Sequence, residues 1–138
     1  MRSWLIRRAR LGILERLRCA HRMLPVAPEQ GLFNFRCHEN CVEYVRTHPD
    51  RDLEVVETIY VDDGEPILHY VVRDRADDRH LEVTLGWRAT TLEYYHVRAL
   101  TEADHPNIHK EFQRSLDYWL HQYVGPFGRH VLRIGRIT

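Results

Sequence analysis

The stretch that decides the fold is residues 53–87, LEVVETIYVDDGEPILHYVVRDRADDRHLEVTLGW. It holds three segments that are rich in β-branched residues and partly alternate apolar with polar positions, which predicts strands at 53–61, 67–73 and 81–87. Asp62-Asp63-Gly64 forms the first turn between them, and a charged loop forms the second. Connections this short join antiparallel neighbours, so the stretch predicts a meander rather than βαβ units.

Helices are predicted on both sides of this meander. Before it, apolar positions at helical spacing predict a helix from about 36 to 46, which His48-Pro49-Asp50 ends. After it, a short strand is expected at 92–97, and a last helix opens at 101–104. The apolar stripe of that helix is Ile108, Phe112, Leu116, Trp119, Leu120 and Tyr123. Gly125-Pro126 ends the last helix, and residues 131–134 are expected to form an edge strand.

The first 24 residues predict a basic amphipathic helix. Apolar residues recur over 3–24 at roughly helical spacing, and the segment 1–24 holds seven Arg against one Glu. Two interpretations remain open: a helix docked on its own domain, which we favour, or a partner-directed helix that binds an acidic partner or a membrane surface. Residues 25–31, with Pro at both 25 and 28, are expected to be a connector.

Length and patterning together predict one α+β domain. A chain of 138 residues is the usual size of a single domain. We expect N-terminal helices packed on a small antiparallel sheet, a C-terminal helix, and a core spanning 30–138. The formal net charge is zero, which argues against a protein that binds nucleic acid through its whole surface.

The cysteines indicate a reducing compartment. Cys19, Cys37 and Cys41 are an odd number, and the last two are only four residues apart, so they do not form a disulfide framework. Free thiols suit the cytoplasm. No apolar run is long enough to cross a bilayer, and no signal peptide is recognisable. We therefore expect a cytoplasmic protein, with no cofactor.

Three side chains point to thiol chemistry. Cys37 lies in the first turn of the helix at 36–46, His69 early in the second strand, and Glu82 in the third. A helix N-terminus stabilises a thiolate, a strand-borne His can take up the thiol proton, and an acidic residue can orient that His. The alternatives are a buried, unreactive Cys37, a half-buried structural His69 and a solvent-facing Glu82.

The motifs that contain these residues resemble papain-like or transglutaminase-like cysteine domains. They read CHEN at 37–40, ILHYVV at 67–72 and LEVT at 81–84. They are most similar to small members, often found in phages and plasmids, with the pattern Cys-x-x-Asn, His-x-x-Val and Asp-x-Thr. The resemblance covers about residues 30–95.

This resemblance implies specific roles. Cys37 would be the nucleophile, His69 the base, and Glu82 would stand where the family usually has Asp or Asn. Three features depart from the family: the third side chain is longer by one methylene, His69-Tyr70 replaces the more usual His-x-Trp, and the papain-type Gln lies one residue too far upstream, at Gln30. Gln30 and Asn34 are candidate oxyanion donors, and Asn40, one turn after Cys37, is a candidate neighbour of the site.

Metal binding is the weaker interpretation of the same residues. Cys37, His38 and Cys41 with a distant His are a possible zinc set, but adjacent Cys and His rarely both reach one metal from a helix. His105 and His109 are four apart at a helix start, and they more simply face solvent.

The function predicted from sequence is a cysteine-dependent acyl transfer on amide bonds of a protein or peptide, as a peptidase, deamidase or transglutaminase-like enzyme. The alternative is a non-catalytic binding or inhibitor protein, such as a phage-encoded inhibitor, that acts through protein contacts. In either case Cys41 is expected to be structural and Cys19 dispensable.

Overall fold

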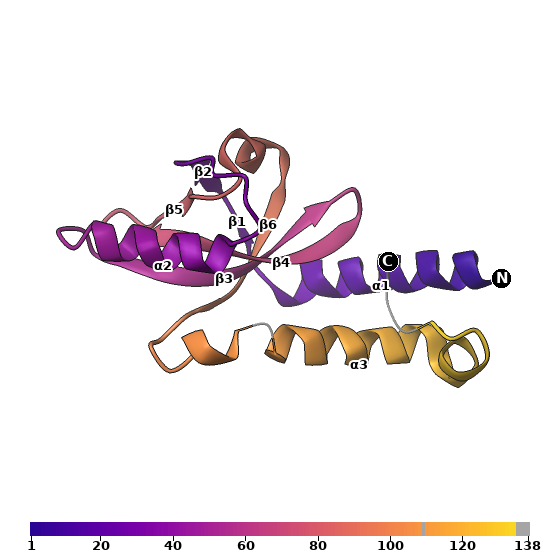
Figure 1. The fold of residues 1–138 in the computed structure, drawn as a ribbon. Coiled ribbons are helices and arrows are strands. Elements are labelled where there is room, and N and C mark those ends of the chain that lie inside the picture. The colour runs from indigo at the N-terminus through magenta and orange to yellow at the C-terminus, as the bar shows by residue number, and fades with distance from the viewer. Residues whose placement is uncertain (109, 135–138) are drawn as a thin grey trace.

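The computed structural model describes residues 1–108 and 110–134, and within the last helix the side chains of 111–113 and 115–116 lie outside the description. Its architecture is α+β, as predicted, with an N-terminal helix, a curled mixed sheet and a C-terminal helix (Figure 1). The elements are α1 (Arg2–Ala20), β1 (Met23–Leu24), β2 (Val26–Pro28), α2 (Cys37–Thr47), β3 (Leu53–Asp62), β4 (Glu65–Asp74), β5 (Arg79–Glu82), the 3-10 helix η1 (Gly86–Thr91), β6 (Glu93–Ala99), the 3-10 turn η2 (His105–Asn107), α3 (Lys110–Pro126) and the π-helical turn η3 (Phe127–Val131).

The predicted meander forms the centre of a six-stranded sheet with the order β1-β6-β3-β4-β5-β2. Strands β3 and β4 pair antiparallel along their whole length, from Leu53 opposite Asp74 to Asp62 opposite Glu65. Asp63 and Gly64 both have positive φ, 47° and 77°, which is the geometry of a two-residue type I′ hairpin turn.

The sheet is mixed rather than purely antiparallel, which corrects the sequence prediction. The segment expected as a connector contains β2, which runs parallel to β5 with Val26 opposite His80 and Pro28 opposite Glu82. Proline is tolerated there because an edge strand needs backbone hydrogen bonds on one side only. The chain that leads to α2 therefore lies along β5 instead of crossing solvent.

Strand β5 ends at Glu82, five residues earlier than predicted, because the Glu82 side chain binds the backbone N–H groups that would have continued the strand. The carboxylate of Glu82 accepts hydrogen bonds from the N–H groups of Thr84 (2.8 Å) and Leu85 (3.0 Å). The chain then turns into η1 instead of continuing as a strand to Trp87. The expected edge strand at 131–134 is also wrong, since the chain from Phe127 forms η3 after a kink at Gly125 with φ 63°.

The last helix begins later than predicted. The carboxylate of Asp104 accepts hydrogen bonds from the backbone N–H and the hydroxyl of Thr101, both at 2.7 Å, so the predicted helix start is present as a local motif. Only the short η2 turn follows directly, and α3 starts at Lys110. The predicted stripe residues Phe112 and Leu116 lie outside the described side chains.

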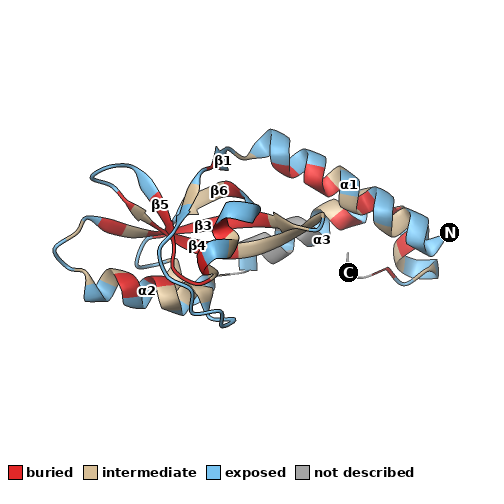
Figure 2. Ribbon diagram, turned by 90° about the horizontal axis from the view of Figure 1, so that it is seen from above, coloured by how far each residue is buried: buried red, intermediate tan, exposed pale blue. Residues whose placement is uncertain are grey.

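Helix α2 covers one face of the sheet. Its buried residues Cys41 and Tyr44 pack with Tyr70, Val72 and Leu81 of the strands. The opposite face holds a second apolar cluster: Leu24, Val56, Tyr60, Val71, Ala89 and Tyr94. Figure 2 shows the buried residues concentrated in the strands and along one stripe of α1.

Helices α1 and α3 lie side by side at the end of the sheet away from α2 (Figures 1 and 2). Leu17 packs on Ile59 and Tyr95 of the sheet, and Ala9 packs on Leu120 and Val124 of α3. This agrees with the docked helix favoured above, although Leu11 is exposed. The helix also ends four residues earlier than predicted, because Met23–Leu24 pairs with β6 as β1. In the described part of the chain no helix has the length and apolarity to cross a membrane.

Candidate active site

The fold brings together Cys37, His69 and Glu82, although they come from three elements. Cys37 is the first residue of α2, His69 lies in the middle of β4, and Glu82 is the last residue of β5. On one side of β4, β3 pairs with it along its whole length, with Thr58 opposite His69. On the other side β5 pairs with β4 only at Val72–Asp74 and then ends, so that edge of β4 is unpaired beside His69. The Glu82 side chain occupies part of that opening.

His69 and Glu82 form a buried ion pair. Nε2 of His69 lies 2.9 Å from Oε2 of Glu82, and the two residues are 4% and 0% exposed. The same Oε2 accepts a hydrogen bond from the hydroxyl of Tyr94 at 2.7 Å. With the N–H groups of Thr84 and Leu85 on Oε1, the carboxylate has four donors, which is full use of its acceptor sites.

The other side of the His69 ring meets the thiol. Cys37 lies close enough to the imidazole for its side chain to help raise the pKa of His69. Since Glu82 occupies Nε2, the nitrogen available to the thiol is Nδ1. Cys37 is partly exposed as a residue, whereas His69 is buried. A thiol, an imidazole and a carboxylate are thus arranged in the order that a nucleophile, its base and the group orienting that base would need.

The two charged partners stabilise each other. Burial by itself lowers the pKa of His69, but hydrogen bonds with Cys37 and Glu82 and the Glu82 charge outweigh it and raise that pKa to about 9. Burial by itself raises the pKa of Glu82, but hydrogen bonding and charge interaction with His69 outweigh it, helped by Leu85 and Tyr94, so the pKa lies below its ordinary value. At neutral pH the pair is imidazolium and carboxylate.

Aromatic rings enclose the imidazole. Tyr60 meets His69 edge to face at 5.2 Å between ring centroids, and Tyr94 lies at 6.2 Å from it. Burial and the Glu82 charge raise the pKa of the Tyr94 hydroxyl, which keeps it protonated and therefore a hydrogen-bond donor. The rings restrict the orientation of His69 and exclude water from its pair with Glu82.

Asn34 and Asn40 join the start of α2 to the turn after β5. Oδ1 of Asn34 accepts from Nδ2 of Asn40 (2.7 Å) and from the backbone N–H of Arg36 (3.1 Å). Nδ2 of Asn40 also donates to the hydroxyl of Thr84 at 3.0 Å. Both hydrogens of that Asn40 amide are used in this way, so its contacts fit a positioning role for Cys37 better than a direct one.

Gln30 lies further from the centre of this arrangement. Its backbone N–H donates to the carbonyl of Glu82 at 3.0 Å, next to the equivalent bond from Glu29. The Gln30 side chain is exposed and lines a surface hollow together with Trp87. An oxyanion role for Gln30 or Asn34 stays a prediction.

The other two cysteines differ sharply from Cys37. Cys41 lies on the face of α2 that packs on the sheet and is fully buried, and this burial raises the pKa of its thiol well above the ordinary value. Cys19 is exposed near the end of α1. The chain thus carries its own references, a buried thiol and an exposed one, for any measurement on Cys37.

The histidines proposed above as metal ligands show a different arrangement. Nε2 of His38 lies 2.8 Å from Nδ1 of His105, so one ring donates to the other across α2 and η2. Within residues 1–108 and 110–134 no group of three or more His, Cys, Asp or Glu side chains is placed to hold a metal ion. His109 lies outside the described residues.

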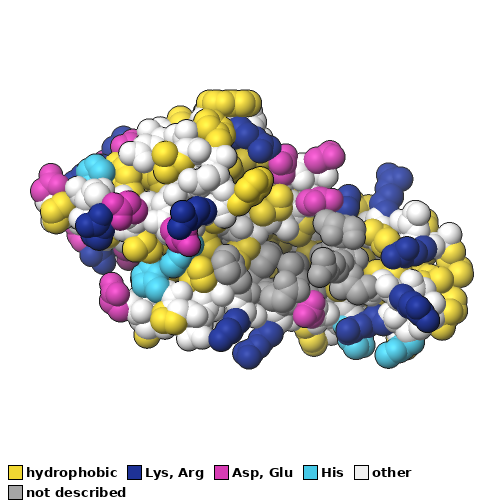
Figure 3. Space-filling view, in the orientation of Figure 1, with side chains coloured by type: hydrophobic (Ala, Val, Ile, Leu, Met, Phe, Trp, Pro, Cys, Tyr) yellow, Lys and Arg dark blue, Asp and Glu magenta, His cyan; other side chains and the backbone are white. Residues whose placement is uncertain are grey.

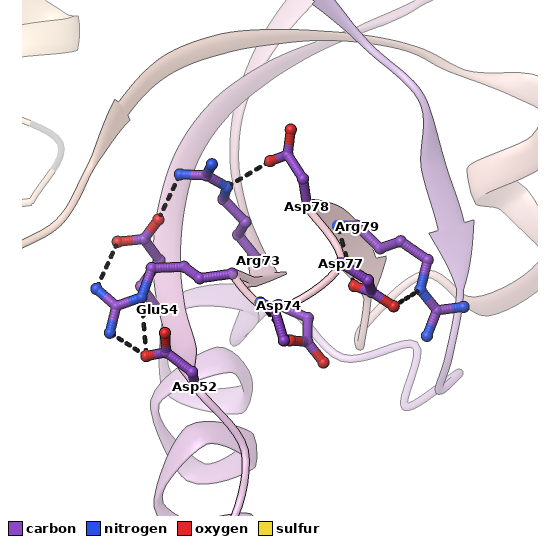
Figure 4. Close-up of polar contacts among 9 residues, drawn as sticks. Asp52, Glu54, Arg73, Asp74, Asp77, Asp78 and Arg79 are labelled. Atoms are coloured by element: carbon purple, nitrogen blue, oxygen red, sulfur yellow. Dashed lines mark hydrogen bonds and ion pairs between the residues drawn. The ribbon is translucent and has the colours of Figure 1, made fainter.

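Charged side chains also gather at the Asp74 end of the β3–β4 hairpin (Figure 4). Arg73 bridges Glu54 at 2.9 Å and Asp78 at 2.8 Å, and Arg51 pairs with Asp74 at 2.7 Å. Hydrogen bonding and charge interaction with Arg73 lower the pKa of Asp78. Arg73 and Asp78 are 35% and 62% exposed, unlike His69 and Glu82, whereas Asp74 is buried beside Arg51.

Sequence reasoning missed Tyr94. It was placed in a possible short strand with no role, and its position depends on β6 returning to the far side of β3, where Tyr94 stands opposite Tyr60. Nothing in the local pattern distinguishes Tyr94 from Tyr95. Thr84 was noticed only as part of the Glu-x-Thr motif, and its backbone N–H is what contacts Glu82.

Comparisons with known proteins found no matching family model, no similar curated protein and no similar solved structure.

Proposed function

We propose that this chain is a cysteine-dependent acyl-transfer enzyme that acts on amide bonds, with Cys37 as nucleophile, His69 as acid and base, and Glu82 as the group that orients and charges His69. The observation that carries the proposal is the buried His69–Glu82 pair, 2.9 Å apart, with the partly exposed Cys37 near enough to influence the same imidazole. A buried ion pair that served stability alone would have no need of a solvent-accessible thiol on the far side of its imidazole.

The first step would form a thioester. The thiolate of Cys37 attacks the amide carbonyl carbon, and the carbonyl π electrons move onto oxygen. As the carbonyl re-forms, the C–N bond breaks and the imidazolium of His69 gives its proton to the leaving nitrogen. The leaving group departs as an amine or as ammonia, and His69 becomes neutral.

The second step would release the acyl group. Neutral His69 takes a proton from water or from an acceptor amine as that molecule attacks the thioester carbonyl. The C–S bond breaks, the thiolate of Cys37 is restored, and His69 is again an imidazolium. Water gives hydrolysis or deamidation, whereas an amine gives transamidation.

Two local features support this chemistry. Cys37 is the first residue of an 11-residue helix, where backbone N–H groups and the helix dipole favour negative charge on sulfur or on a nearby oxyanion. Glu82 keeps its charge because four donors satisfy it. It can therefore stabilise the imidazolium that each cycle regenerates.

The test is competitive alkylation of the three thiols by limiting iodoacetamide at pH 6, with peptide mass spectrometry as the readout. We expect Cys37 to react at least about tenfold faster than Cys19 although Cys19 is more exposed, because a thiolate is the reacting species. His69→Ala should abolish that advantage. If Cys37 reacts no faster than Cys19, the site is inert and a non-catalytic role for the chain is the better account.

A further inference from the structure

Large apolar side chains are exposed beside the candidate active site. Phe33, Phe35 and Trp87, which we call the aromatic shelf, have 54%, 107% and 66% of their surface exposed. The two Phe lie in the segment that leads into Cys37. Trp87 lies in η1, just after the turn whose N–H groups bind Glu82. In Figure 3 hydrophobic side chains gather at the upper edge, where Figure 1 places β2 and the loop above it.

Two residues of the shelf, Phe33 and Trp87, line a hollow of about 290 Å³ between these two segments, and Phe35 projects from the same segment as Phe33 without lining it. Gln30, Gly31, Phe33, Gly86 and Trp87 are among the residues that line it. Its floor is backbone, because a Cβ on Gly86 would lie only 2.9 Å from Cα of Gly31. The volume is at the lower end of ligand pockets, which suits one side chain of a longer molecule rather than a complete small ligand.

Phe33 is held in a conformation that bulky residues avoid. Its φ is 49°, in the left-handed region, and its N–H donates to the carbonyl of Thr84 at 2.8 Å. An aromatic residue with positive φ is strained, and here one side of the ring packs on the backbone of Gly31 and Gly86 while about half of the residue stays exposed.

The shelf and the thiol are close along the chain. Cys37 is the fourth residue after Phe33. Because an extended chain spans at most about 3.6 Å per residue, the Cα atoms of Phe33 and Cys37 lie within roughly 14 Å of each other. Thr84 anchors both parts, since its carbonyl binds Phe33 and its hydroxyl binds Asn40 of α2. A strand rises about 3.3 Å per residue, so an extended polypeptide bridges the gap with two to four residues.

We propose that the aromatic shelf binds a large apolar side chain of an extended polypeptide substrate, two to four residues away from the carbonyl that Cys37 attacks. This inference rests on the proposed function and narrows its substrate class from amides in general to polypeptide segments with an aromatic or large aliphatic residue near the reacting amide.

The experiment measures peptide binding without chemistry, using the full chain with Cys37→Ala. The probes are fluorescein-labelled peptides of about ten residues, with one Gln as the reacting residue, a Phe two, three or four positions to either side, and otherwise Ala and Ser. A glycine counterpart replaces each Phe. Fluorescence anisotropy gives the dissociation constants.

At least one Phe peptide should bind about tenfold more tightly than its glycine counterpart, since burying an aromatic ring is worth about that much. Trp87→Ala and Phe35→Ser should reduce the difference to about twofold or less. The matched control is Trp4→Ala, because Trp4 is similarly exposed, at 59%, but lies on α1. This control should leave the difference unchanged.

Three results would overturn the inference. The Phe and glycine peptides could bind alike at every position, or Trp4→Ala could weaken binding as much as Trp87→Ala. A dimer that Trp87→Ala converts to a monomer in sedimentation would assign the shelf to a second copy instead. Iodoacetamide is too small to need the shelf. Rapid alkylation of Cys37 with no Phe preference would therefore refute only the peptide-binding role of the shelf. Phe-selective binding with an unreactive Cys37 would refute both the substrate assignment and the proposed enzyme activity.

Discussion

Strand β4 carries ion pairs of two kinds, and they lie only four residues apart. At Arg73 the guanidinium bridges Glu54 and Asp78 at the surface, where Figure 4 shows the contacts spread over one end of the hairpin. At His69 the imidazole contacts Glu82 inside the sheet, with almost no exposure of either residue.

The two regions differ in burial and in the number of hydrogen bonds to each charge, rather than in the number of charges, and this difference is what singles out the candidate site. Water and salt screen the Arg73 pairs, and each partner could be hydrated if the other were lost. The carboxylate of Glu82 has no such alternative, because protein donors supply all of its hydrogen bonds. Charge at His69 is therefore determined by its neighbours and can be put to chemical use.

The largest effect is expected at Cys37, the thiol beside the buried His69–Glu82 pair. Cys37→Ser should lower amide turnover by at least about a thousandfold and leave the melting temperature within a few degrees, because the oxygen nucleophile is far weaker at this position. The control is Cys41→Ser, the same change one turn along α2. It should keep turnover but reduce the melting temperature, since Cys41 is fully buried and its hydroxyl would gain no partner. The reverse pattern would show that Cys41 is the reactive thiol.

Removing the buried carboxylate should have the next largest effect. Glu82→Gln leaves His69 without its counter-ion and presents an amide to three further donors, so we expect a loss of about 3 kcal/mol in the free energy of unfolding at pH 7. Urea denaturation measures it. A loss below about 1 kcal/mol would place this pair in the same class as the surface pairs.

The pH dependence of unfolding sharpens the same point. The pKa of His69 is raised to about 9, so its contribution to stability is complete below its ordinary pKa of 6.5 and is lost as the pH rises through about 9. The pKa of Glu82 is lowered from 4.5, so its contribution is present above about 4.5 and is lost as the pH falls further. The stability gap between the native chain and Glu82→Gln should be widest between these limits.

A smaller effect is expected at the residue that sequence reasoning missed. Tyr94→Phe removes one of four donors to Glu82 and should cost about 2 kcal/mol, the usual range for a hydrogen bond to a charged group. Tyr95→Phe is the matched control, because its hydroxyl donates to the half-exposed Glu93. Tyr94→Phe should also shift the acid limb of the pH–rate profile, whereas Tyr95→Phe should not. Equal effects would reduce Tyr94 to a packing residue.

The smallest effect is expected in the surface region. Asp78→Asn removes a partner of Arg73, yet Glu54 remains, so the melting temperature should stay within about 2 °C and turnover should be unchanged. Differential scanning calorimetry measures the shift. A change as large as that of Tyr94→Phe would mean that the hairpin end is structurally coupled to the buried pair.

The sequence predicts the parts of this account that depend on local pattern. The β3–β4 hairpin follows from alternating β-branched residues and the Asp-Gly turn, and the start of α2 follows from its apolar spacing. Strand β2 was missed because three residues between prolines hold too little local signal, and its pairing with β5 depends on contacts distant in the chain.

Some residues of the candidate site could likewise be predicted from local pattern, and others could not. Cys37, His69 and Glu82 could be proposed from residue type and order, since each lies near an element end or in a strand that the pattern reveals. The capture of Thr84 and Leu85 by Glu82, which ends β5 early, and the hydroxyl of Tyr94 could not be predicted. They depend on side-chain directions in a sheet whose outer strands are not evident from periodicity.

The most direct test of the central claim is the titration of His69 itself, followed by long-range ¹H–¹⁵N correlation of the imidazole nitrogens. If Glu82 holds His69 as an imidazolium, we expect both ring nitrogens to be protonated at pH 7 and the ring to titrate near 9. We also expect Glu82→Gln to lower this pKa. A His69 ring that is neutral at pH 7 and titrates at or below 6.5 in the native chain would contradict it, because the imidazole would then lack the charge assigned to it.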